Sequence, residues 1–247
     1  MEIQEITTIR NLRDLGGIKN KEGKTIRNNC LFRSAYFNRA SKQDTDTLYD
    51  KYNLHTIIDL RTYAEAAEKP DLNGKIDYIH MPVIESFLDG VTHEEGEEQK
   101  AHNYPEMSKM YRLIVTSDRQ KENFAKILNF IMDNDFEKGG LLWHCSEGKD
   151  RCGLVTTLVL TALDVDKETI AEDYLLTNKY NSGKAQSMYE YVLSLADEAA
   201  ARHVYNAFVA DEKYLNSAFE AMGDDYLYSE LKLDKDKVRK FKEKVLI

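Results

Sequence analysis

The sequence predicts an α/β fold in which a central, mostly parallel sheet is flanked by helices and the C-terminal half is rich in helix. Short aliphatic runs alternate with helical patterns up to about residue 160, and from about residue 166 helical signals follow one another almost without a break. Strands that alternate with helices favour a parallel sheet. The chain has 247 residues, 42% of them hydrophobic, and no Gly/Ser-rich linker divides it, so we expect a single domain over residues 1–247.

Three β-branched or aliphatic runs predict strands, at residues 55–60, 76–81 and 140–143. We expect residues 15–33, with a turn signal at 21–23, to add an antiparallel edge. Ser41 and Asp44 resemble a capping box that opens one helix, and apolar positions sharing one face predict another at residues 124–131. Further helices are predicted by their periodicity at residues 184–195, 212–222 and 234–245, so that residues from about 183 to 247 supply helical cap elements.

The acidic stretch at residues 85–107 shows no clear period. We expect it to form a surface loop or lid, and a solvated, disordered excursion is the alternative.

The charge balance limits the partners of the chain. Its 34 Lys+Arg and 43 Asp+Glu give a net charge of −9, which disfavours nonspecific binding to nucleic acid or anionic membranes, so any phosphate site must be local. No apolar run is long enough to cross a bilayer, and the start of the chain is acidic where a signal peptide is basic. We therefore expect a cytoplasmic protein without stable membrane insertion and without a nucleic-acid partner.

Three cysteines, Cys30, Cys145 and Cys152, occur without the C-x-x-C spacing of zinc or thioredoxin-like redox sites. This pattern disfavours a disulfide scaffold and a zinc centre.

The segment that carries chemistry is HCSEGKDRCG at residues 144–153, between a predicted strand and the apolar helix at 154–160. A strand, a tight loop and a helix N-terminus together form an anion cradle of main-chain N–H groups. Five residues separate Cys145 from Arg151, so a loop around a tetrahedral oxyanion can place the thiol below it and the guanidinium beside it. Gly148 permits the tight turn where a Cβ would block the anion. The cradle favours the thiolate of Cys145, which can attack phosphorus to form a phosphocysteine.

These residues resemble the signature of the cysteine-based protein tyrosine phosphatases, His-Cys-x-x-Gly-x-x-Arg followed by Ser or Thr. The resemblance is closer to a mainly microbial branch whose loop reads HCxxGKDRTG and whose members are similar to tyrosine, dual-specificity and phosphoinositide phosphatases. Four other blocks resemble recurring blocks of that branch in the right order: NLRDLGG at 11–17, LFRS at 31–34, IDLR at 58–61 and DYLLTN at 173–178.

The resemblance implies a tyrosine-phosphatase-like fold and a metal-independent phosphomonoester hydrolase with no cofactor. Its substrate would be a phosphotyrosine-containing protein or peptide, and phosphoserine, phosphothreonine and phosphoinositides stay open as further substrates.

By the same resemblance, Cys145 is the nucleophile and Arg151 clamps the transition state. The phosphate-binding residues are Ser146, Glu147, Gly148, Lys149, Asp150 and Arg151, with Lys149 adding positive charge over the phosphate. Asp150 is the first candidate for the general acid, because the segment after residues 81–83 lacks the Asp that the wider family uses there. Asp89 and Asp118 are weaker alternatives.

A set of supporting residues surrounds the loop in this interpretation. His144 is expected to hold the loop by hydrogen bonds. Two roles stay open for the charged residues of the other blocks, which either brace the cradle through ion pairs or cap strand ends: Arg13, Asp14, Arg33, Asp59 and Arg61.

Two positions depart from the family pattern. Cys152 stands where the family has Ser or Thr, so hydrolysis of the phosphoenzyme could be slow. It is either packed in place of that residue or a redox partner of Cys145. Glu147 stands where a small residue is common, and an acid weakens anion binding unless it faces solvent or a neighbouring basic group.

Two alternatives to a phosphatase stay open. The departures at Cys152 and Glu147 keep open a pseudophosphatase that binds phosphorylated ligands without turnover. Another thiol enzyme, such as a sulfurtransferase or arsenate reductase, is disfavoured because the surrounding blocks resemble neither.

Overall fold

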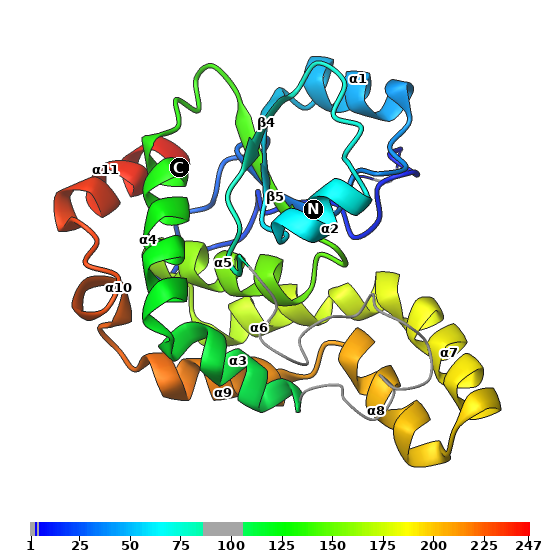
Figure 1. Ribbon diagram of the computed structural model, residues 1–247. Helices are drawn as coiled ribbons and strands as arrows, with labels where there is room; N and C mark the ends of the chain where they lie inside the picture. The colour runs from blue at the N-terminus through cyan, green and yellow to red at the C-terminus, as the bar shows by residue number, and fades with distance from the viewer. Residues whose placement is uncertain (1–2, 4, 86–105) are drawn as a thin grey trace.

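The centre of the molecule is a five-stranded sheet with the strand order β1-β2-β5-β3-β4 (Figure 1). The computed structural model describes residues 3, 5–85 and 106–247. The strands are β1 Arg13–Asp14, β2 Leu31–Ala35, β3 Leu54–Asp59, β4 Asp77–His80 and β5 Gly140–Cys145. β1 pairs antiparallel with β2, and the other neighbours pair in parallel. The predicted α/β fold with a mostly parallel sheet is therefore confirmed.

Helices follow the strands and cover the sheet (Figure 1). They are α1 Lys42–Asp50, α2 Tyr63–Glu68, α3 Met107–Thr116, α4 Asp118–Asp133, α5 Asp150–Ala162, α6 Lys167–Leu175, α7 Thr177–Leu195, α8 Glu198–Phe208, α9 Glu212–Met222, α10 Tyr226–Ser229 and α11 Lys235–Val245. Ser41 caps α1 by accepting a hydrogen bond from the main-chain N–H of Asp44, as its sequence pattern predicted. The helix predicted at 184–195 is the second part of the longer α7.

Successive side chains of β5 point to opposite faces of the sheet, so they belong to two different apolar clusters. Leu141 and Trp143 belong to the larger apolar cluster, which includes residues of α4, α5 and α6. Leu142 points to the smaller cluster, together with Leu48 of α1. Every residue of β5 is buried, as expected for an inner parallel strand covered on both faces.

The sequence prediction placed residues 15–33 at an antiparallel edge, and the structure corrects part of this. The edge strand is the two-residue β1, whereas Leu31–Ala35 forms β2 inside the sheet, in parallel register with β5. The residues of β2 are all buried. Alternation within the segment did not reveal an inner strand because two of its five residues, Arg33 and Ser34, are polar.

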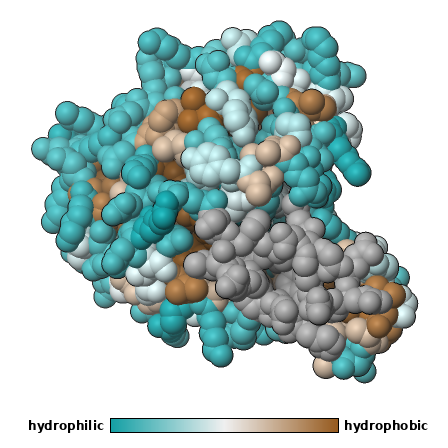
Figure 2. Space-filling view, viewed as in Figure 1, coloured by the Kyte–Doolittle hydropathy of each residue, from teal (hydrophilic) through white to brown (hydrophobic). Residues whose placement is uncertain are grey.

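The helices of the C-terminal half pack in two different ways. α9 packs against α3, and α11 packs against α4. α7 and α8 form a hairpin with an apolar cluster of its own that includes Val192 and Val204, and it extends away from the sheet (Figure 1). Figure 2 shows hydrophobic residues at the surface of this hairpin on an otherwise mostly hydrophilic face, and Leu193 and Leu195 are among its exposed side chains. The helical cap at 183–247 stays a prediction.

Two further predictions are limited by what the structure describes. The predicted lid at residues 85–107 lies mostly outside the described residues. Within the described part of the chain, no helix combines the length and apolar character needed to cross a membrane.

Candidate active site

The Cys145 thiol lies at the C-terminal end of an inner strand, directly before a helix. Cys145 is the last residue of β5, residues 146–149 form the loop, and Asp150 begins α5. Cys145 is 2% exposed and Arg151 is 9% exposed. In open α/β sheets, ligands bind outside the carboxyl ends of the strands, where helix N-termini also converge. The strand, loop and helix predicted from the sequence are therefore in place.

The carbonyl groups of the loop face the body of the protein. Asn11 donates through Nδ2 to the carbonyl oxygens of Glu147 at 3.1 Å and Gly148 at 3.0 Å. Arg33 donates through Nη2 to the Gly148 carbonyl at 2.8 Å. The main-chain N–H groups of residues 146–149 donate to no described residue. The loop is thus held to the body of the protein through its acceptors.

Gly148 makes the turn of the loop possible. Its φ of +68° lies in the left-handed region that side-chain-bearing residues rarely adopt. A Cβ at this position would lie 2.6 Å from the carbonyl group of Ser34 and 2.8 Å from the nitrogen of Ala35. The predicted tight turn is present. The structure adds a second reason for glycine at this position, because a Cβ would collide with the end of β2.

A buried ionic chain supports the loop from behind. Asp173 of α6 accepts from Arg13 Nε at 2.7 Å and from Arg33 Nη1 at 2.5 Å, and Arg33 in turn holds Gly148. Burial by itself would raise the pKa of Asp173, but the two guanidinium groups lower it to about 2. These contacts are those that the bracing alternative describes for Arg13 and Arg33, whose role stays a prediction. Asp173 was noted only as part of a sequence block, without a role.

The contacts of Asp14 are those of a residue that caps the backbone at the end of a strand. Its Oδ1 accepts from the main-chain N–H of Gly16 at 2.8 Å, and its Oδ2 accepts from that of Asn29 at 2.8 Å. Burial raises the pKa of this carboxyl group. Asp14 thus caps the backbone that connects β1 to β2.

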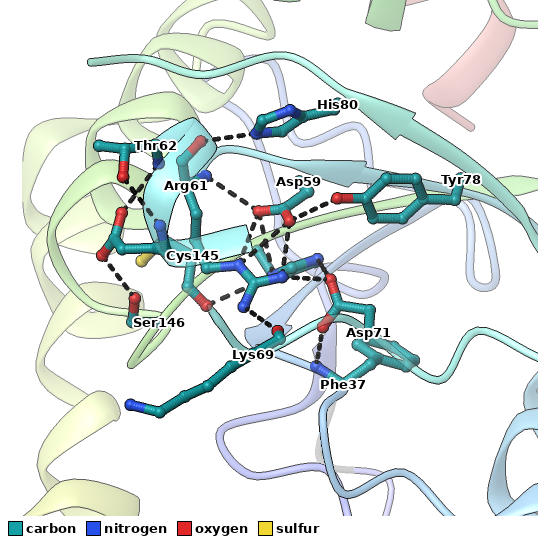
Figure 3. A network of polar contacts seen from close by, with 12 residues as sticks. Phe37, Asp59, Arg61, Thr62, Lys69, Asp71, Tyr78, His80, Cys145 and Ser146 are labelled. Carbon is teal, nitrogen blue, oxygen red and sulfur yellow. Dashed lines mark hydrogen bonds and ion pairs between the residues drawn. The ribbon is translucent and has the colours of Figure 1, made fainter. Parts of the chain in front are cut away.

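A second polar network lies at the end of β3 (Figure 3). Arg61 pairs with Asp59 and with Asp71, in each case with 2.7 Å between Nη2 and Oδ2, and the Tyr78 hydroxyl donates to Asp59 at 2.7 Å. His144 belongs to the same group, with Nε2 3.2 Å from Asp71 Oδ2 and Nδ1 3.3 Å from the carbonyl oxygen of Cys145. Burial alone would lower the pKa of His144, but the two carboxylates raise it. His144 is fully buried, and its contacts fit the structural role predicted for it.

This network also contains the described residues whose spacing could suit a metal ion. Ligand atoms of Asp59, Asp71 and His144 lie within 4.8 Å of one another. Arg61 already pairs with both carboxylates, so their negative charge is compensated within the protein.

Glu65 is a site residue that the sequence analysis missed. Its Oε1 lies 2.8 Å from Arg151 Nη2 and its Oε2 lies 2.5 Å from Arg151 Nη1, and Ser146 Oγ donates to Oε1 at 2.9 Å. Glu65 also forms a reciprocal capping box with Thr62 at the start of α2. Burial would raise the pKa of Glu65, but Arg151 lowers it to about 2. The Thr-x-x-Glu pattern directly after IDLR was the signal that could have revealed it.

Asp150 lies in the first turn of α5 and is 8% exposed. Its Oδ1 accepts from the Tyr111 hydroxyl at 2.8 Å, and the Tyr111 and Tyr174 hydroxyls are 2.7 Å apart. Burial raises the pKa of both tyrosines well above the ordinary value. Tyr111 was not predicted to contact the site.

The two weaker candidates for the general acid differ in what the structure shows. Asp89 lies outside the described residues. Asp118 begins α4, and its carboxylate is 96% exposed and lies 3.4 Å from Lys121 Nζ.

Lys149 points from the loop toward the end of α8. Its ammonium donates to the carbonyl oxygens of Ala207 and, at 3.2 Å, Val209, and lies 3.2 Å from Asp150 Oδ1. The residue is 1% exposed. In this structure the Lys149 ammonium therefore links the loop after β5 to the end of the α7–α8 hairpin.

Glu147 faces basic groups. This is one of the two environments expected for it, the other being solvent. Its Oε2 lies 3.0 Å from Arg10 Nη2, and its Oε1 accepts from the Lys184 ammonium. The Glu147 side chain is 7% exposed.

Cys152 is buried in α5. Its Sγ donates to the main-chain oxygen of Trp143 at 3.6 Å, and burial raises the pKa of its thiol to about 11. All three cysteines are free and buried.

The chain is similar in sequence to known phosphatases. A profile described as "Tyrosine phosphatase family" matches residues 4–247. A protein of Cupriavidus necator that is assigned by name to the tyrosine-protein phosphatases is 28% identical over 245 residues, covering 94% of this chain and 85% of its own length. The triple specificity protein phosphatase PtpB of Mycobacterium tuberculosis is 26% identical over 202 residues, covering 72% and 70%.

Solved structures resemble the chain more distantly. The Siw14 catalytic core is 12% identical with a TM-score of 0.34, covering 87% of this chain and 94% of its own. P. aeruginosa TpbA in complex with phosphotyrosine is 15% identical with a TM-score of 0.30, covering 81% and 91%. The family profile spans nearly the whole sequence and includes the loop between β5 and α5. The chain belongs to the tyrosine phosphatase family of phosphoric monoester hydrolases.

Proposed function

We propose that the protein hydrolyses phosphotyrosine in proteins or peptides through a phosphocysteine intermediate, without a metal ion. The observation that carries this proposal is the placement of Cys145 and Arg151 at the two ends of a loop whose carbonyl groups are turned to the protein body. The main-chain N–H groups of residues 146–149 then bind the phosphoryl oxygens. Arg151 adds a guanidinium edge that stabilises charge in the transition state.

In the first step the Cys145 thiolate attacks phosphorus, and the bond between phosphorus and the tyrosine oxygen breaks. Asp150 donates a proton to the leaving oxygen, as the residue in the first turn of α5 beside Arg151. In the second step water attacks the phosphocysteine, Asp150 takes up a proton from it, and the sulfur–phosphorus bond breaks to release inorganic phosphate and the thiolate.

The contacts of Asp150 bear on this role. The Tyr111 hydroxyl donates to Asp150 Oδ1 at 2.8 Å, and the Lys149 ammonium lies 3.2 Å from the same oxygen. These contacts hold the carboxyl group at the start of α5, beside the loop that binds the phosphate.

Hydrolysis of an aryl phosphate in the presence of a chelator tests the proposal. We expect the wild type to release phosphate and Cys145→Ser to be inactive, whereas Cys30→Ser, which replaces another buried cysteine, should retain activity. An inactive wild type, or a fully active Cys145→Ser variant, contradicts the proposal. Phosphoinositide vesicles assayed alongside decide whether that substrate class is also accepted.

Cys152 supports a second candidate, an enzyme that stalls after the first step or a pseudophosphatase. Its thiol donates to Trp143, and burial raises its pKa to about 11, so it is a weak substitute for the family's hydroxyl group. Release of one equivalent of the aryl alcohol followed by arrest identifies the stalled enzyme. Phosphopeptide binding with no release at all identifies the pseudophosphatase.

A further inference from the structure

A cavity lies where the ends of four helices meet. Its lining comes from the C-terminal parts of α5 and α9, from the N-terminal part of α6 and from α10, together with Lys21. Its volume is about 330 Å³. Figure 1 shows α10 on the side of the molecule away from the α7–α8 hairpin. Thr161 in the cavity wall is about 15 Å from Arg151 along α5, at about 1.5 Å per residue, so the cavity is separate from the candidate active site.

The floor of this cavity is apolar and fixed by the core. Its buried side chains belong to the larger apolar cluster, and they include Leu158, Val165, Ile170, Phe219 and Leu227. Gly223, which follows α9 in the wall, has no side chain that could fill the space. The volume lies at the lower end of the range for small-molecule sites, roughly 300–1,000 Å³, and such sites combine an apolar lining with a few polar groups.

Two lysine side chains at the cavity form no ion pair with any residue in the described part of the chain. They are Lys21 and Lys167, and both are exposed. The Lys167 ammonium lies 5.2 Å from the centroid of the Phe219 ring, so its charge is placed against the apolar floor. The charge of Lys21 acts on Asp166, whose pKa is lowered chiefly by hydrogen bonds from Thr169.

The negative charges at the cavity are fewer than the positive ones. Asp164 pairs with Lys242, so its charge is compensated. Asp224 is exposed and has no ion pair among the described residues. A third lysine, Lys235, lies 5.1 Å from the centroid of the Tyr228 ring in the wall and is also without a described ion pair. Three uncompensated ammonium groups against one carboxylate favour an anionic ligand, although the chain as a whole has a net charge of −9.

We propose that this cavity binds a small aromatic carboxylate. In this arrangement the ring packs on the apolar floor beside Phe219, and the carboxylate accepts hydrogen bonds from the ammonium groups of Lys21 and Lys167. The site goes beyond the proposed function and does not depend on it, because none of its lining residues belongs to the loop after β5.

Calorimetric titration of the full chain with indole-3-acetate tests the site. Indole and tryptamine are the comparison compounds, because they carry the same ring system without a charge and with a positive charge. We expect indole-3-acetate to bind with a dissociation constant of about 1 mM or below. Indole and tryptamine should each bind about fivefold more weakly or worse.

Variants at exposed positions locate the binding. Lys21→Gln combined with Lys167→Gln should weaken the binding of indole-3-acetate about tenfold, since two charged partners are lost. Thr161→Trp enlarges an exposed side chain of the wall and should abolish binding. Lys240→Gln is the control, because it removes a charge at an exposed position of α11 outside the lining and should leave the affinity unchanged. A melting temperature within about 2 °C of the wild type shows that each variant is folded.

Three results would overturn the proposal. The first is no saturable binding of indole-3-acetate up to about 10 mM. The second is equal or tighter binding of indole or tryptamine, which would show that the lysines do not select an anion. The third is unchanged binding in the folded Thr161→Trp variant, which would place the compound elsewhere on the protein, the catalytic loop included.

Discussion

Replacing Glu65 by Gln removes the charge that holds Arg151 and keeps the shape of the side chain. The ordinary pKa of a glutamate is about 4.5, and Arg151 lowers that of Glu65 to about 2 despite burial. The difference corresponds to about 3 kcal/mol of stability that the ionised carboxylate contributes and a neutral isostere lacks. We therefore expect Glu65→Gln to lower the free energy of unfolding by about 3 kcal/mol at pH 7, or the melting temperature by about 6–12 °C.

The pH dependence of this difference has a defined direction. Because the folded-state pKa of Glu65 lies below its unfolded value, its contribution is fully present above about pH 4.5 and is lost as the pH falls toward 2. Urea unfolding of the wild type and Glu65→Gln should show a constant difference from pH 7 to pH 5 and a smaller one below. Glu68→Gln, on the same helix with a side chain 62% exposed, is the control and should change stability by less than about 0.5 kcal/mol. A difference below about 1 kcal/mol at pH 7, or one that does not change with pH, would refute the reasoning.

Three further changes test the loop itself. Gly148→Ala should reduce aryl phosphate turnover about a hundredfold, since a Cβ would meet backbone 2.6 Å away at a φ of +68°, and near-normal activity would show that the loop relaxes. Cys152→Thr should raise the steady-state rate relative to the initial burst, and an unchanged ratio would show that Cys152 does not limit the second step. Tyr111→Phe removes a donor that positions Asp150, so kcat for the aryl phosphate should fall. A change confined to KM would contradict that role.

Much of the fold could be predicted because strands and helices leave local patterns. The strand at 140–145 is apolar up to the histidine before the nucleophile, and the helices at 212–222 and 235–245 have clear periodicity. β2 was misplaced because Arg33 is buried within it, and a buried arginine looks like an exposed residue in a sequence. Its partners, Asp173 and Gly148, lie far along the chain, so no local pattern could show that its charge is compensated.

In the candidate site, too, the residues that are close in sequence could be predicted, and those brought together by the fold could not. Cys145, Gly148 and Arg151 occur within one short loop, where their spacing carries the chemistry. Glu65 and Tyr111 reach the loop through the fold, with separations of 86 residues from Arg151 and 39 residues from Asp150. Their chemistry is ordinary in isolation, a helix-capping glutamate and a core tyrosine, and only the tertiary structure brings them to the loop.

The position of Glu65 also decides how Arg151 can bind a phosphate. Glu65 engages both Nη1 and Nη2, so it occupies the terminal edge of the guanidinium group. The Nε atom makes no hydrogen bond with any described residue, which leaves the edge formed by Nε and one Nη for phosphoryl oxygens. Glu65 therefore fixes the plane of the arginine without competing for the edge that the substrate needs. This arrangement explains why losing the carboxylate should reduce kcat as well as stability, since a freely rotating guanidinium would no longer meet the transition state in one orientation.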